Sequence, residues 1–198
     1  MSRNKTVLIT GIAIAFVCLA VFMYKGMLTI TDKHVIKRDF SNVSEIVNTI
    51  LYPDHSKSVE APITIHDYVD IEEYRYYLIE SVNSEKTQIG FVRIKRSHNG
   101  IYIFDELKLG GSTNFSSDIC KTDHKTYLIY GGRNPSEEIK SVYFRFPGSE
   151  KYGYEANVKG GKRFLFAIEI DKSISDVKGL QVKMFSESNE DITYKYEW

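Results

Sequence analysis

Residues 89–109, IGFVRIKRSHNGIYIFDELKL, decide the fold of this chain. Two runs rich in β-branched and aromatic residues, 89–96 and 101–109, flank the tetrapeptide Ser97-His98-Asn99-Gly100. Asn and Gly tolerate the positive φ angles of a tight turn, and Asn-Gly between two such runs is the strongest short-range signal of a hairpin. The stretch therefore predicts two antiparallel strands joined by a tight turn.

Alternating patterns continue through the rest of the chain after Ile63. In residues 162–170, large apolar side chains recur at every second position, which predicts that one face of a strand lies against the core. The side chains of that face are Phe164, Phe166, Ile168 and Ile170. Val142, Phe144 and Phe146 alternate in the same way, which leaves Tyr143 on the opposite face.

Further strand patterns are separated by short clusters of turn residues. They span residues 74–82, 126–130, 139–146, 154–159, 180–185 and 192–198. Gly160-Gly161 lies between two of the runs and predicts a second tight hairpin. With almost no helical pattern after Pro53, the sequence predicts a mainly β fold, an antiparallel sandwich or barrel-like domain of about eight to nine strands.

A short amphipathic pattern precedes the strands. Apolar side chains fall at helical spacing over residues 40–51, and Pro53 ends the pattern. Asn42 and Glu45 fit the N-cap and the third position of a capping box. We expect a helix at about residues 42–52. Its apolar stripe has an ordinary width, which favours packing on the β domain over binding a separate partner.

The most apolar stretch, residues 7–24 (VLITGIAIAFVCLAVFMY), contains no charged side chain. As a helix it would cover about 27 Å, close to the ~30 Å thickness of the hydrocarbon core of a bilayer. We expect one transmembrane helix, a signal anchor that contacts the lipid bilayer through residues 7–24. The alternative is a signal peptide cleaved after Ala20, although residues 21–24 continue the apolar run past that site.

The expected organisation is a basic tail at residues 1–6, the membrane helix at 7–24, a juxtamembrane stalk at 25–39 and a β-rich domain at 40–198. A short basic leader before an apolar run is typical of a signal anchor, so we expect the domain on the extracytoplasmic side of a cell membrane. Cys18 and Cys120 fall in different segments, so they are not expected to form a disulfide within one molecule. The single-pass arrangement resembles small surface proteins of Gram-positive bacteria in architecture alone, which implies no site.

The composition limits the classes of function. The 198 residues include 26 Lys+Arg and 26 Asp+Glu, which gives a formal net charge of zero. Nucleic-acid binding depends on clustered positive charge, so the sequence argues against a nucleic-acid partner. At 42% hydrophobic residues, the chain has enough apolar surface to form a core.

No motif assigns a catalytic, cofactor or metal site, and none is expected. Residues 66–73, HDYVDIEE, bring four carboxylates and a histidine together, but their spacing does not match a calcium loop. A solvated, charged sheet edge is the simpler interpretation. Cys120 lies close to His124 in the sequence, yet the polar stretch CKTDHK does not indicate the lowered thiol pKa of a nucleophile.

Tyrosine is unusually frequent, with 14 residues. Aromatic rings on an exposed sheet face can stack on sugars or bind a protein, although Tyr also suits half-buried strands. The candidate ligand or partner surface consists of Tyr143, Tyr194, Tyr196 and Trp198.

Three hypotheses for function follow. In the first, a membrane-anchored extracytoplasmic β-domain binds a protein or glycan partner as an envelope-associated or accessory module. In the second, the domain is a cell-envelope hydrolase that uses carboxylates between Asp67 and Glu73, although no spacing selects a catalytic pair. In the third, the chain is a subunit of a membrane complex, recognised through a small-residue face at Gly11 and Ala15.

Overall fold

The structure is a computed structural model that describes residues 35–37, 40–51, 63–83, 86–97, 100–110, 114–147 and 153–196. The chain divides into two compact units, Met1–Val35 and Ile36–Trp198. The expected membrane segment at residues 7–24 lies outside the described residues, as does Trp198. Among the helices of the described ranges, none has both the length and the apolar character needed to cross a membrane.

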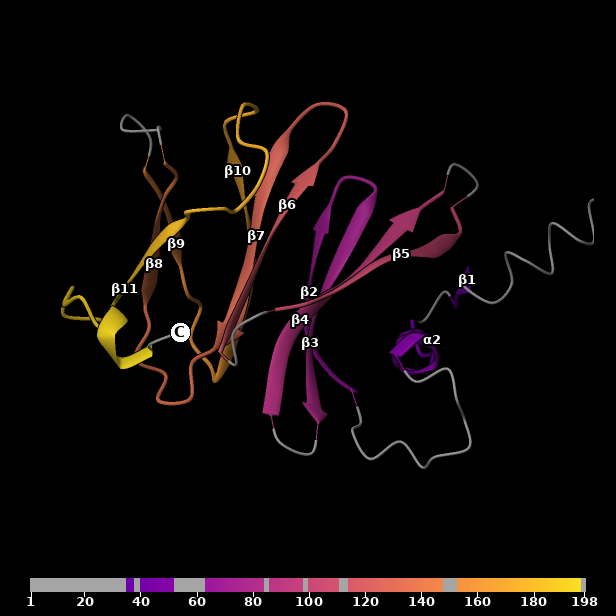
Figure 1. The fold of residues 1–198 in the computed structure, drawn as a ribbon, viewed down its shortest axis with the longest axis horizontal. Helices are drawn as coiled ribbons and strands as arrows, with labels where there is room; N and C mark the ends of the chain where they lie inside the picture. Colours follow the sequence, from indigo (N-terminus) through magenta and orange to yellow (C-terminus); the bar gives the residue numbers. More distant parts are fainter. Residues whose placement is uncertain are drawn as a thin grey trace, which may run out of the picture. The chain divides into compact units, whose positions relative to one another are not determined.

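The second unit is mainly β, with antiparallel sheets, as the sequence predicts (Figure 1). Sheet A has five strands in the order β1-β5-β4-β3-β2. Their bounds are Val35–Ile36 for β1, Ile63–Ile71 for β2, Tyr74–Asn83 for β3, Lys86–Arg96 for β4 and Tyr102–Leu109 for β5. Strands β4 and β5 pair antiparallel, which confirms the hairpin expected over residues 89–109.

Two smaller sheets, each with three strands, form the rest of the β structure in the described part of this unit. Sheet B has the order β10-β7-β6, and sheet C has the order β11-β8-β9. The bounds of sheet B are Phe115–Lys121 for β6, Thr126–Arg133 for β7 and Arg163–Ile170 for β10. Those of sheet C are Ser141–Arg145 for β8, Gly153–Asn157 for β9 and Gln181–Phe185 for β11.

The buried apolar side chains form three clusters, and each cluster lies between two layers of these elements. Helix α2 (Val43–Leu51), within the range expected for a helix, packs on one face of sheet A. The other face of sheet A packs on sheet B, and the far face of sheet B packs on sheet C (Figure 1). We call the two sheet contacts the A–B interface and the B–C interface. The buried apolar residues of the A–B interface are Ile71, Tyr76, Leu78, Ile89, Phe91, Cys120 and Ile129.

Strand β3 serves two of these clusters. Tyr77 and Ile79 pack toward α2, whereas Tyr76 and Leu78 pack toward sheet B. Because side chains alternate along a strand, the next residue on the B-facing side is Glu80, which is buried. A carboxylate therefore interrupts an otherwise apolar row.

Two β-bulges interrupt the alternation that the sequence suggests. On β2 the pairing register skips His66, and on β5 it skips Asp105, so each is the extra residue of a bulge. A bulge re-aims the side chain of the extra residue and turns the following ones to the other face. Both extra residues contact a charged side chain at the A–B interface: His66 contacts Glu80, and Asp105 contacts Arg93.

Two sequence predictions about strands are wrong. Gly160 and Gly161 do adopt positive φ, but the strands that they connect lie in different sheets, because β9 pairs with β8 and β10 pairs with β7. Residues 192–198 were expected to form a strand, whereas Thr193–Tyr196 form a 3₁₀ helix. Strand β6 is not among the predicted strands, because its sequence, FSSDICK, is too polar to show a strand pattern.

Candidate functional site

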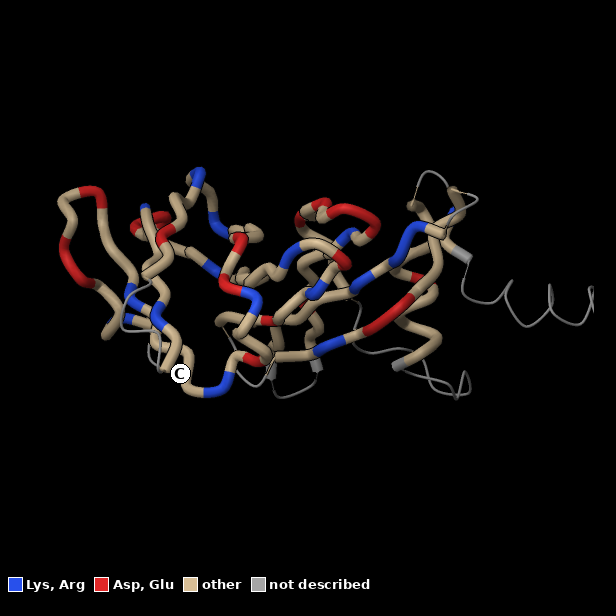
Figure 2. The backbone as a smooth tube through the Cα atoms, turned by 90° about the horizontal axis from the view of Figure 1, so that it is seen from above, with Lys and Arg blue, Asp and Glu red and all other residues tan. Residues whose placement is uncertain are grey.

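A cleft of about 820 Å³ opens at one end of the A–B interface. Its walls come from the β2–β3 turn, the adjoining ends of β3 and β4, the middle of β5 and the residues at and after the end of β6. We call it the Tyr74 cleft. Its charged lining consists of Glu72, Glu73, Asp105 and Asp123 with Lys95, Arg96 and Lys121. Both signs of charge thus surround one tyrosine ring, and both signs are interspersed along the rest of the described backbone (Figure 2).

The β2–β3 turn presents two of the acidic side chains. The hairpin closes between Ile71 and Tyr74, which leaves only Glu72 and Glu73 in the turn. Glu72 has a φ of 51°, in the left-handed region that costs an L-residue about 1 kcal/mol. The Tyr127 hydroxyl donates to the Glu72 carboxylate at 3.4 Å, and the Glu73 carbonyl accepts from the backbone N–H of Arg96 at 2.7 Å. The turn is therefore attached to both sheets.

Tyr74 lies against the cationic side of the cleft. The Lys95 Nζ lies 5.1 Å from the centroid of the Tyr74 ring and 4.0 Å from Glu73 Oε1. The guanidinium carbon of Arg93 lies 5.5 Å from the same ring centroid. Cations over an aromatic face are attracted by its quadrupole, so these contacts hold the ring in place.

A chain of hydrogen bonds supports the wall of the cleft from inside the A–B interface. The Arg93 Nε donates to Asp105 Oδ2 at 2.5 Å, and Arg93 Nη1 donates to the Tyr76 hydroxyl at 3.1 Å. The Tyr76 hydroxyl donates in turn to Asp118 Oδ2 at 3.2 Å, and Lys108 Nζ donates to Asp118 Oδ1 at 2.6 Å. Burial raises the pKa of Tyr76, so the hydroxyl keeps the proton that it donates. Asp105 is thereby held in position by groups on both sheets.

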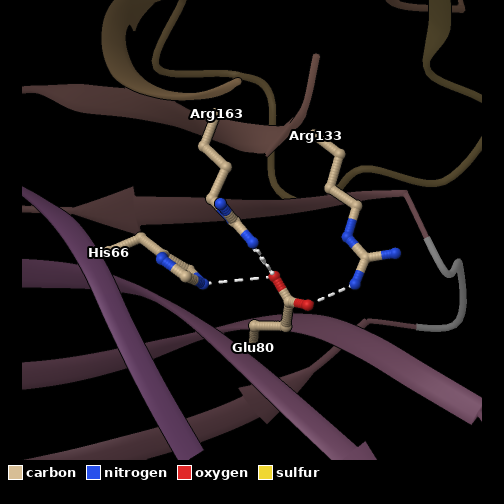
Figure 3. Close-up of polar contacts among 4 residues, drawn as sticks. All are labelled: His66, Glu80, Arg133 and Arg163. Carbon is tan, nitrogen blue, oxygen red and sulfur yellow. Dashed lines mark hydrogen bonds and ion pairs between the residues drawn. The ribbon is translucent and has the colours of Figure 1, made fainter. Parts of the chain in front are cut away.

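A second charged cluster occupies another part of the A–B interface (Figure 3). Glu80 of β3 accepts from Arg163 of β10 at 2.8 Å from Nη2 and 3.1 Å from Nε. It also accepts from Arg133 Nη2 of β7 and from His66 Nε2 of β2, the latter at 3.1 Å. The four side chains, which we call the Glu80 cluster, connect sheet A to sheet B. Tyr74 and Glu80 are six residues apart on β3, so about 20 Å separates the cleft from this cluster.

The protonation states in the Glu80 cluster follow from its surroundings. Burial alone would raise the pKa of Glu80, but the hydrogen bonds from Arg163 and Arg133 outweigh it and hold that pKa below its ordinary value. Burial lowers the pKa of His66, and the positive charge of Arg163 lowers it further. At neutral pH the carboxylate is therefore ionised and the imidazole is neutral. Since an ionised carboxylate only accepts, the proton of His66 resides on Nε2.

The residues of the sequence-predicted aromatic surface are not all exposed. Tyr194 is 69% exposed, and Tyr143 is half-buried. Tyr196 is buried, and its ring packs edge-on against Phe115 at 5.8 Å between centroids. Trp198 lies outside the described residues.

The acidic stretch from Asp67 to Glu73 divides into two parts. Asp67 and Asp70 are exposed on β2, at the edge of sheet A, and Asp70 accepts from Arg75 at 2.5 and 2.8 Å. Glu72 and Glu73 instead line the Tyr74 cleft.

Cys120 lies in the apolar part of the A–B interface, where it is 1% exposed. Burial raises the pKa of its thiol, which disfavours the thiolate that a nucleophile needs. Within the described ranges, no group of three or more His, Cys, Asp or Glu side chains could hold a metal ion.

Sequence reasoning did not find the Glu80 cluster. One signal was present, because Glu80 interrupts the strand pattern YRYYLIESV at a core-facing position. Its partners could not be identified in the same way, since Arg133 and Arg163 lie 53 and 83 residues further along the chain.

No protein-family model, curated protein or solved structure matches the chain.

Proposed function

We propose that the chain is a membrane-anchored extracytoplasmic binding module whose sandwich-like β domain holds its ligand in the Tyr74 cleft. The observation that carries the proposal is the cleft itself, with charges of both signs around an aromatic ring. Its volume of about 820 Å³ lies within the ~300–1,000 Å³ range of ligand sites. The hydrogen bond from Arg93 to Asp105 fixes this wall of the cleft before a ligand binds. Such preorganisation reduces the entropic cost of binding.

The lining favours a polypeptide segment that carries both positive and negative side chains. A ligand of one sign would meet like charge in the lining, which carries both signs. A peptide of mixed charge can pair with the acidic and with the basic side chains of the lining while an apolar or aromatic side chain packs on Tyr74.

The anchor of this proposal is the apolar run at residues 7–24. Its length matches the hydrocarbon core of a bilayer, and a basic leader precedes it. Such an anchor would hold the domain at the extracytoplasmic surface of the cell membrane, where the cleft can bind partners in the envelope.

A second candidate function is favoured by the acidic lining. Glu72 and Glu73 belong to the stretch from Asp67 to Glu73, and the cleft adds Asp105 and Asp123. Two suitably spaced carboxylates can act as general acid and as base or nucleophile in hydrolysis. In this alternative the cleft binds an envelope polymer and cleaves it.

The test uses the full-length protein in a non-ionic detergent, applied to arrays of peptides and of glycans. We expect the wild type to retain peptides that contain both Lys or Arg and Asp or Glu. Tyr74→Ala removes the ring, and Ser97→Trp fills the cleft, so each is expected to weaken retention about tenfold or more. Tyr194→Ala is the matched control, because Tyr194 is an exposed tyrosine that does not line the cleft.

Retention that survives Tyr74→Ala and Ser97→Trp but is lost in Tyr194→Ala would move the binding surface to the exposed tyrosine. Retention of glycans alone would overturn the assignment of a peptide ligand. Cleavage of a retained polymer, abolished by Glu73→Gln without loss of retention, would favour the hydrolase.

A further inference from the structure

Two arginines face each other at the end of sheet B. Arg133 on β7 and Arg163 on β10 are register partners in the antiparallel pair. Like charges directly opposite each other destabilise a strand pair, so this position needs a compensating anion. Glu80, from the neighbouring sheet, supplies one negative charge to both guanidinium groups (Figure 3).

Glu80 already accepts hydrogen bonds from all three of its neighbours in the cluster. A carboxylate has about four acceptor positions, and Glu80 accepts two hydrogen bonds from Arg163, one from Arg133 and one from His66. The two guanidinium groups together carry ten N–H donors, and among the residues that the structure describes Glu80 accepts from three of them. The other donors are the ones that an anion from solution can use.

The charge of the cluster is also unbalanced. With His66 neutral, two guanidinium charges face one carboxylate, which leaves one positive charge in excess. The side chains of Arg133 and Arg163 are 27% and 35% exposed, whereas Glu80 is 10% exposed. An anion from solution can thus reach the guanidinium groups but not replace the carboxylate beneath them.

We infer that Arg133 and Arg163 form an anion-binding site for a phosphate or sulfate group. A guanidinium binds such a group through paired N–H donors, and a tetrahedral oxyanion has enough oxygens to accept from both arginines at once. This site lies about 20 Å from the Tyr74 cleft along β3, so it is independent of the proposed peptide binding.

The test is calorimetric titration of the full-length protein in a non-ionic detergent, with chloride keeping the ionic strength constant. Inorganic phosphate and the phosphodiester glycerophosphoglycerol are the two probes. The first represents a free anion, and the second represents a phosphate carried on a polymer or a lipid. We expect saturable binding of at least one probe, and the tighter one identifies the source of the phosphate group.

The variants separate binding from a structural role. Arg163→Gln and Arg133→Gln are expected to weaken binding about tenfold or more, whereas Arg145→Gln, which removes an exposed arginine from β8, should leave it unchanged. Glu80→Gln should instead tighten binding about tenfold, because it removes the internal competitor and leaves two positive charges uncompensated. Saturable binding by the wild type that is weakened in Arg163→Gln and kept in Arg145→Gln separates a binding site from a purely structural ion cluster.

The inference is overturned if neither probe binds the wild type, if Arg145→Gln weakens binding as much as Arg163→Gln, or if Glu80→Gln weakens binding. Arg163→Lys serves where Arg163→Gln does not fold, since it keeps the charge opposite Glu80 but loses the paired donors. Weaker binding of phosphate by Arg163→Lys than by the wild type supports the site, and equal binding opposes it.

Discussion

The two faces of sheet B meet their neighbours through different chemistry. The B–C interface is dominated by aromatic rings, with Tyr130 and Phe144 edge to face at 4.9 Å and Phe164 and Phe166 stacked at 5.5 Å between centroids. The A–B interface has an apolar centre around Leu78, with the Glu80 cluster at one end and the network of Arg93 and Asp118 toward the cleft.

This difference suggests that the B–C interface mainly stabilises the fold and that the charged groups of the A–B interface mainly position binding sites. Aromatic packing in the B–C interface contributes apolar burial that depends little on pH or salt. Buried ion pairs contribute less net stability, because their mutual attraction is offset by desolvation. Charge at both ends of the A–B interface is therefore better explained by what it positions, the wall of the cleft at one end and the paired arginines at the other.

The largest expected effect tests the structural role of the B–C interface. Phe144 is fully buried there, so Phe144→Ala leaves a cavity and is expected to lower the free energy of unfolding by about 3–5 kcal/mol. Denaturant unfolding of the full-length protein measures the change. Tyr194→Ala, at an exposed aromatic residue, should change it by less than about 0.5 kcal/mol. A loss below about 1 kcal/mol for Phe144→Ala would mean that this interface is not a tight core.

The aromatic interface is also the part of the fold that the sequence predicts best. Phe164, Phe166 and Phe144 follow the period of two, and all three pack into the B–C interface. The hairpin over residues 89–109 is equally predictable from the sequence, because the Asn-Gly turn signal and the strand patterns are local. Local signals suffice where neighbouring residues determine the structure.

The pairing of distant strands and the position of the bulges depend on information that the sequence does not carry locally. Gly160 and Gly161 have the positive φ of a tight turn, yet β10 pairs with β7, and a turn cannot specify a distant partner. The bulge at Asp105 does leave a signal in the sequence pattern of β5. Tyr102 and Phe104 face the α2 side, as do Leu107 and Leu109, so the apolar phase changes between them.

The second prediction tests whether the A–B interface depends on charge. Glu80→Gln leaves two arginines without their carboxylate, which should lower the free energy of unfolding at pH 7 by about 2 kcal/mol.

Acid should weaken the wild type in two steps. The folded-state pKa of His66 lies below 6.5, so the unfolded chain takes up a proton first and stability falls as the pH decreases from about 6.5. The folded-state pKa of Glu80 lies below 4.5, so its contribution is lost as the pH falls from about 4.5.

Denaturant unfolding at a series of pH values separates the two steps. His66→Gln should remove the first, and Glu80→Gln should reduce the second. His124→Gln is the matched control, because His124 is exposed in the turn between β6 and β7. If the His66 and His124 variants give the same pH profile, the imidazole in the Glu80 cluster does not contribute to the acid sensitivity.

The smallest effect comes from two buried tyrosines that differ in what their hydroxyl groups contact. Tyr76, in the A–B interface, accepts from Arg93 and donates to Asp118. Tyr130, in the B–C interface, has a buried hydroxyl with no hydrogen-bond partner among the residues that the structure describes. Removing one member of a buried hydrogen bond costs about 1–3 kcal/mol, whereas removing an unpaired hydroxyl relieves a desolvation penalty.

Tyr76→Phe should therefore lower the free energy of unfolding by at least about 1 kcal/mol, and Tyr130→Phe should leave it unchanged or raise it slightly. Each variant loses one oxygen atom from a buried ring, so each is the control for the other. Equal losses would show that the Tyr130 hydroxyl also has a partner, and the contrast between a polar and an aromatic interface would fail at that position. If only Tyr76→Phe is costly, the hydroxyl that links Arg93 to Asp118 contributes to the stability of the A–B interface, as expected for a group that fixes the wall of the cleft.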